Sequence, residues 1–211
     1  MARLFNNTKD FCFVTVNTFS IKSSKVFLIN PVDPLSGLTL VWECEALAHC
    51  IIEHHKGFLY LFTDAAKGGQ PVDYHYLLCS LVDISAPRKW ENIFIDDREL
   101  IIEDVDFCDT HLVLIVREGR KFKLCSVALP LPTREGAVHL KELNPHFLPL
   151  PKYVSQISPG PNYDYYSSTM RFTISSPVAW LLALVILPAR SNMMICVGLI
   201  TYLALVSVLI T

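Results

Sequence analysis

The feature of this sequence that most limits its fold is the spacing of its apolar segments. Short stretches rich in Val, Ile, Leu, Phe and Tyr recur along residues 1–177, and turn residues separate them. Before Pro177, almost no segment places apolar residues at the helical spacing i, i+3, i+4 over three turns. This pattern is typical of strands, so we predict an all-β fold for this part of the chain.

Strong turn signals separate the predicted strands. They occur at Asn30–Gly37, Lys67–Pro71, Arg117–Arg120 and Pro159–Asn162, and Gly119 suits a tight hairpin. The predicted strands are Phe11–Asn17, Lys25–Ile29, Leu38–Cys44, Cys50–His54, Phe58–Phe62, Tyr76–Val82, Trp90–Ile95, Leu100–Asp106, His111–Arg117, Lys121–Leu129, Val138–Leu143 and Met170–Ser175.

Two pairs of segments suggest a repeated unit. His55–Thr63 is followed by Tyr76–Val82, and Thr110–Arg117 is followed by Lys123–Leu129 in a similar pattern. The period is about four strands in 40 to 50 residues, as in a β-propeller blade. Because a closed propeller needs at least about four blades, we predict an open, partial β-propeller of about three four-stranded antiparallel blades. A β-sandwich with similar hairpins is the alternative.

Charge and cysteine usage narrow the class of protein. The 18 Lys and Arg residues nearly balance 20 Asp and Glu residues, which excludes a strongly basic nucleic-acid binder and a disordered acidic tail. Seven cysteines are scattered without a CxxC pair, which indicates buried free thiols in a reducing compartment. The first residues lack the apolar core of a secretory signal, so we expect a cytoplasmic module.

The last 34 residues differ from the rest of the chain. Val178–Thr211 contains a single charge, Arg190, so we divide the chain into a propeller domain over 1–177 and a hydrophobic tail over 178–211. Asn192–Thr211 is uncharged and long enough, as a helix, to cross a bilayer, and we expect it to be a transmembrane anchor. Val178–Leu187 is too short to cross alone. The alternative is an apolar extension that aggregates or packs on exposed sheet.

One group of side chains has the composition of a metal site. Zinc sites usually show paired ligands such as CxxC or HxxxH that converge on the ion. Strand alternation would instead place Cys50 and His54 on one face and His49 and His55 on the other. We therefore interpret the group as buried thiols and edge histidines, with no metal or cofactor; its members are Cys44, His49, Cys50, His54 and His55.

Other candidate side chains have simpler interpretations. We expect Glu103, Asp104 and Asp106 to be solvated or turn charges, and Tyr163, Tyr165 and Tyr166 to serve packing, although they could line a peptide path. The pentapeptide Gly-x-Ser-x-Gly, which presents the nucleophile of many serine hydrolases, does not occur in the 211 residues. We predict no catalytic residues in this chain.

Several blocks nevertheless resemble a known family of enzymes. Their order and spacing are similar to the propeller domain of the prolyl oligopeptidase family of serine peptidases, in the branch of oligopeptidase B and prolyl-endopeptidase-like proteins. The blocks are Ser23–Ile29, Asn30–Leu35, Glu53–Thr63, Trp90, Ile102–Phe107 and Met170–Pro177.

The resemblance implies a link to peptide hydrolysis, and it also implies that the catalytic part of the family is missing from these residues. In that family a seven-bladed propeller caps an α/β-hydrolase domain and admits short peptides to a Ser-Asp-His triad. Ser175-Ser176-Pro177 matches the point where the family's chain re-enters the hydrolase domain, but the apolar tail follows here. We expect a truncated serine-type endopeptidase relative that is inactive alone. The alternative is a membrane-tethered β-sheet module that binds peptides or a protein partner through open edges.

Overall fold

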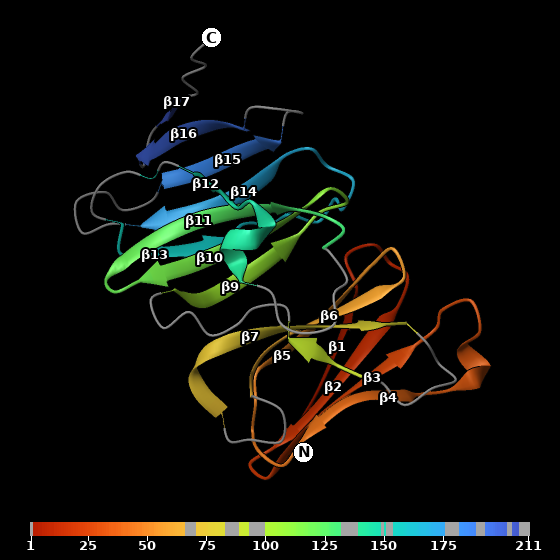
Figure 1. The fold of residues 1–211 in the computed structure, drawn as a ribbon. Coiled ribbons are helices and arrows are strands. Elements are labelled where there is room, and N and C mark those ends of the chain that lie inside the picture. Colours follow the sequence, from red (N-terminus) through yellow and green to blue (C-terminus); the bar gives the residue numbers. More distant parts are fainter. Residues whose placement is uncertain are drawn as a thin grey trace. The chain divides into compact units, whose positions relative to one another are not determined.

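The computed structural model of this protein is built from antiparallel β-strands (Figure 1). It describes residues 2–65, 71–82, 89–92, 100–131, 139–148, 150, 154–175, 182–188, 193–201 and 204–206. Two compact units divide the chain. Unit 1 comprises Met1–Asp97 and Pro132–Glu142, and unit 2 comprises Arg98–Leu131 and Leu143–Thr211.

Unit 1 contains two successive meanders, in which neighbouring strands in the sequence pair antiparallel. The first runs in the order β1-β2-β3-β4, and in the second β5, β6, β7 and β8 pair in turn. The bounds are β1 Ala2–Asn7, β2 Val14–Ser20, β3 Ser23–Ile29, β4 Thr39–Cys44, β5 Cys50–His55, β6 Phe58–Ala65, β7 Pro71–Leu81 and β8 Glu91–Asn92, with a 3-10 turn η1 at Pro34–Ser36.

The core of unit 1 forms because strand alternation gives each meander an apolar face. Along β3 the side chains alternate strictly between partly exposed and buried, so Val26 and Leu28 point the same way. They cluster with apolar side chains from β4 to β7, and this buried face fixes the register of the strands. The other buried members are Val41, Cys50, Ile52, Leu59, Leu61 and Leu78.

Unit 2 repeats the arrangement with two further meanders. Strands β9 to β12 pair in order, and β13 to β17 form a five-stranded sheet in order. The apolar cluster of this unit includes Val113 and Ile115 from β10 and Phe172 and Ile174 from β14. The bounds are β9 Ile101–Phe107, β10 His111–Glu118, β11 Lys121–Ala128, β12 His146–Leu148, β13 Gln156–Pro159, β14 Met170–Ser175, β15 Leu182–Pro188, β16 Met193–Thr201 and β17 Ala204–Val206.

The predicted all-β class with antiparallel sheets is confirmed. The predicted repeat of four strands is found only in part, because the last meander has five strands. The segments singled out as a repeat occupy the same places in successive meanders, because β6-β7 and β10-β11 are both the second and third strands. Before Pro177, three strands are absent from the prediction: β1, β12 and β13. The prediction of a strand at Val138–Leu143 is wrong for the described part of this segment, because Leu140–Leu143 forms a 3-10 turn, η2. The end of Trp90–Ile95 lies outside the described residues.

The structure of the hydrophobic tail contradicts a second prediction, that of a membrane-spanning helix. The helix expected over Asn192–Thr211 is not found: the described residues there form β16 and β17, and β15 precedes them (Figure 1). β15 pairs with β14, and β16 pairs with β15. Val and Ile, which favour strands, make up nine of the tail's 34 residues, and β14 provides a strand to pair with. No helix in the described ranges is both apolar enough and long enough to span a membrane.

Candidate functional site

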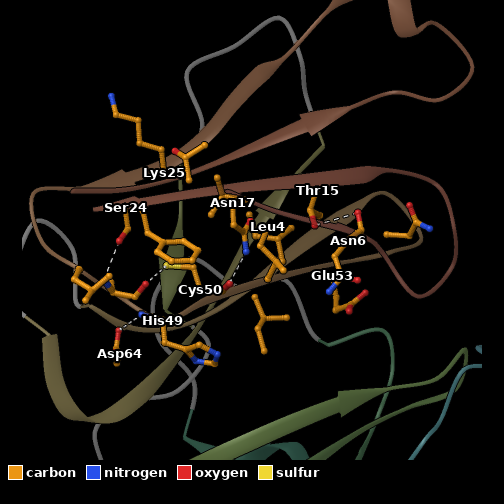
Figure 2. Close-up of a pocket in the computed structure, with 18 residues that line it drawn as sticks. Leu4, Asn6, Thr15, Asn17, Ser24, Lys25, His49, Cys50, Glu53 and Asp64 are labelled. Carbon is orange, nitrogen blue, oxygen red and sulfur yellow. Dashed lines mark hydrogen bonds between the residues drawn. The ribbon is translucent and has the colours of Figure 1, made fainter. Parts of the chain in front are cut away.

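A pocket of about 630 Å³ lies within unit 1, between the first meander and β5 (Figure 2). Leu4 and Asn6 of β1 stand opposite Asn17 and Thr15 of β2, so these four side chains share one face of the sheet. Consecutive residues from Ala48 to Glu53 line the opposite side, so the pocket follows the backbone of β5. Its volume lies in the usual range of ligand pockets.

The backbone of β5 is available along this pocket because β5 is the last strand of its sheet. His55 and Phe58 flank the two-residue turn to β6, so they form a hydrogen-bonded pair. Alternation then directs the N–H and C=O groups of Cys50, Ile52 and His54 away from β6. The Cys50 carbonyl already accepts a hydrogen bond at 2.9 Å from the Asn17 Nδ2 amide (Figure 2).

The Asn17 side chain therefore makes a hydrogen bond to β5 that a neighbouring strand would otherwise make. Its Nδ2 donates to the edge of β5, while its Oδ1 is buried and has no hydrogen-bond partner among the described residues. An unsatisfied buried acceptor is costly, and it indicates a place where a further donor would bind favourably. Lys25 beside the pocket is paired with Glu43 at 2.9 Å.

A second polar arrangement clamps the β1–β2 loop onto β5. Asp10 Oδ2 and His54 Nδ1 are 2.5 Å apart, and both side chains are largely buried. Asp10 Oδ1 also accepts hydrogen bonds from the Thr8 hydroxyl and the Cys12 backbone N–H. Burial raises the pKa of Asp10, but the hydrogen bonds from His54, Cys12 and Thr8 outweigh it and lower this pKa to about 2.

The Asp10–His54 clamp resembles a metal site or an acid-base pair, but the direction of the hydrogen bonds to the His54 ring disfavours both. Asp10, Cys12 and His54 bring three possible ligand atoms within 4.8 Å of one another. However, His54 Nε2 accepts the Gly57 backbone N–H at 3.1 Å, so the ring proton of the neutral imidazole is on Nδ1. A metal on Nδ1 would force a proton onto Nε2, facing the Gly57 N–H. The same contact occupies the nitrogen that a general base would use.

The cysteine and histidine residues proposed from the sequence do not converge on one point. Cys44 and Cys50 are buried thiols, as predicted, and burial raises the pKa of Cys50 to about 12. His54 joins the clamp, and His49 contacts His75 instead of the other members. His55 is fully buried, so its interpretation as an edge histidine is wrong. The contacts of His49 and His54 come from distant segments, which local patterns do not predict.

The acidic residues of β9 have structural partners. Glu103 is paired with Arg117, and the Asp104 carboxylate accepts the Val105 backbone N–H. Asp106 is buried, which contradicts the expectation of a solvated charge, and its Oδ2 accepts a 2.6 Å hydrogen bond from Asn162.

The tyrosine cluster is divided between the core and the surface of unit 2. Tyr165 is buried and packs edge-on against Tyr166, whereas Tyr163 and Tyr166 are largely exposed. Packing therefore explains Tyr165, as predicted from the sequence, but not Tyr163.

Solved structures show which fold this arrangement of meanders shares. Oligopeptidase B from Trypanosoma brucei, with covalently bound antipain, superposes with a TM-score of 0.71 over 92% of this chain and 27% of its own, at 16% identity. Oligopeptidase B from Leishmania major gives 0.67 over 92% and 26%, at 14% identity. The fold is that of the propeller region in these peptidases.

Curated relatives extend the likeness to sequence. A prolyl endopeptidase-like protein of Xenopus laevis is 26% identical over 171 residues, which cover 81% of this chain and 22% of the relative. The Homo sapiens protein of the same name is 27% identical over 112 residues, 53% of this chain and 15% of its own. No family model matches. The predicted resemblance to the prolyl oligopeptidase family is confirmed, and the chain spans about a fifth of the length of the first relative.

Proposed function

We propose that this chain is a substrate-facing propeller portion of a prolyl-oligopeptidase-type protein and that the 211 residues alone do not hydrolyse peptides. The observation that carries this proposal is the succession of antiparallel meanders that superposes on oligopeptidase B over 92% of the chain. The sequence contains no Gly-x-Ser-x-Gly, so it offers no nucleophile on the sharp strand-to-helix turn that this chemistry uses.

The proposed lack of peptide hydrolysis is tested with the purified 211-residue chain. We expect no turnover of a fluorogenic peptide and no labelling by a fluorophosphonate probe, which reacts with activated serines. A full-length oligopeptidase B serves as the positive control under the same conditions. Labelling of this chain, abolished by boiling, would contradict the proposal.

We further propose that short extended peptides bind in the pocket along β5. An added strand could use the outward N–H and C=O groups of Ile52 and His54, as in other cases where a peptide extends a sheet edge. The unsatisfied Asn17 Oδ1 belongs to the opposite wall of the pocket and could accept a peptide N–H after a small side-chain rotation. Leu4 and Leu47 provide apolar contacts for alternate side chains of the ligand.

This binding mode is tested by changing the ligand, because changes in β5 would also disturb the core. A fluorescein-labelled octapeptide of alternating Val and Thr should raise fluorescence anisotropy on binding. N-methylation of one alternate set of peptide nitrogens should abolish binding, whereas N-methylation of the other set should leave it nearly unchanged, since only one set faces β5. Equal losses from both sets would contradict edge pairing.

A further inference from the structure

Two imidazoles from distant segments meet at one end of the pocket. His49 lies in the loop between β4 and β5, and His75 lies in β7. His49 Nδ1 and His75 Nε2 are 3.3 Å apart; His49 is exposed and His75 is half-buried. Figure 2 shows His49 at the pocket wall, with its backbone N–H bonded to Asp64.

The surrounding packing holds the two rings in place. Phe62 of β6 is buried and stacks on His75, with ring centroids 4.3 Å apart and an interplanar angle of 19°. The same phenyl ring meets the His49 ring edge-on at 6.2 Å. The β6–β7 ladder also shifts register between Thr63 and Ala65, next to His75. Such bulges redirect side chains and are common beside functional sites.

The separation of the two nitrogens fits a shared metal ion. Imidazole nitrogens bind zinc at about 2.0–2.1 Å, and two tetrahedral ligands at that distance lie about 3.3–3.4 Å apart. The observed 3.3 Å matches this value and is at the long end for a direct hydrogen bond. Asp64 accepts the His49 backbone N–H at 2.8 Å, so it holds the segment that carries His49.

We propose that His49 and His75 form a binding site for a divalent transition metal ion of the zinc type, with water completing the coordination. Imidazole nitrogen suits zinc, nickel and copper but not magnesium or calcium. The sequence alone indicates no such site, because the predicted group contains His49 but not His75. This inference is independent of the proposed peptide binding and of any peptidase activity.

The test is a calorimetric titration of the full chain with zinc chloride, with magnesium chloride in a parallel titration. We expect saturable zinc binding that EDTA reverses, and no magnesium binding. His49→Ala and His75→Ala should each lower the zinc affinity by at least about tenfold. The matched control His146→Ala removes an exposed imidazole in unit 2 and should change the affinity less than about twofold.

X-ray absorption of the zinc-loaded wild-type chain decides the question even where a variant fails to fold. We expect nitrogen and oxygen ligands at about 2.0–2.1 Å, with the scattering pattern of two imidazoles. A sulfur ligand at about 2.3 Å would overturn the proposal, because it would place the ion at a cysteine, such as Cys12 in the Asp10–His54 clamp. Zinc binding that survives His75→Ala but is lost in Cys12→Ala would do the same, as would the absence of zinc binding by the wild type.

Discussion

Asp10 carries a charge that stabilises the β1–β2 loop. Its carboxylate accepts hydrogen bonds from three partners, and one of them, His54, belongs to a strand 44 residues away in the sequence. The loop between β1 and β2 is thus fastened to β5 by a charged group, because the ionised form of Asp10 is the one that these donors favour. Protonation of Asp10 should weaken this attachment.

The lowered pKa of Asp10 predicts acid sensitivity. Since the pKa falls from 3.8 to about 2 on folding, the ionised carboxylate contributes stability above pH 4, and this contribution is lost as the pH falls from about 4 to 2. The loss should be about 2 kcal/mol in the free energy of unfolding. Urea unfolding of wild type and Asp10→Asn measures it: the variant should lack this part of the decline. Asp33→Asn, at an exposed position, is the control and should decline like wild type.

At the scale of elements, the β5–β6 hairpin depends on its two-residue turn. Lys56 and Gly57 both have positive φ, 46° and 86°, which matches a type I′ turn. The Gly57 N–H donates to His54 and its carbonyl accepts the Val82 N–H. The turn therefore fixes the hairpin, and it also determines which nitrogen of the His54 ring carries the proton.

Substitution of Gly57 tests this dependence. A Cβ at this position meets no atom within 4 Å, so any destabilisation comes from the positive φ alone. We expect Gly57→Ala to lower the free energy of unfolding by about 1 kcal/mol, and Gly57→Asn to cost less because Asn tolerates this conformation. Chemical unfolding of both variants measures the difference. An equal or larger loss in Gly57→Asn would contradict an origin in the backbone conformation.

At the scale of the whole molecule, the hydrophobic tail is part of a sheet. Its strand β15 pairs with β14 over five residue pairs, from Met170 opposite Ile186 to Ile174 opposite Leu182. On the other side β14 pairs with β13, so the tail makes β14 an interior strand. Apolar residues that would suit a membrane thereby serve to complete a sheet of unit 2.

Removal of the tail should expose β14 as an edge. A chain ending at Ser175 would leave the backbone groups of β14 without the partners that β15 supplies, and exposed edges promote association between molecules. We expect this shortened chain to unfold at a lower temperature than the full chain and to form larger species in size-exclusion chromatography. The same midpoint and a monomeric profile for both chains would contradict this role of β15.

Local patterns predict the strands of this fold well where one face is buried. The alternation around Val26 and Leu28 and the turn at Gly119 are visible in the sequence, and both lie where predicted. β1 is missed because all six of its residues are exposed and no apolar period marks them. The tail is misread because apolar length alone does not distinguish a membrane helix from paired strands. The pair of His49 and His75 depends on folding, since 26 residues separate its members.

Because β5 pairs with another strand on one side only, its amides should differ in hydrogen exchange. The amides of Ile51, Glu53 and His55 face β6 and should exchange slowly with deuterated solvent, whereas those of Ile52 and His54 point away from β6 and should exchange faster. The strand should thus show an alternating pattern of protection with a period of two residues. Peptide bound along β5 would slow the fast set and leave the slow set unchanged, so the occupancy of this edge can be read from single amides.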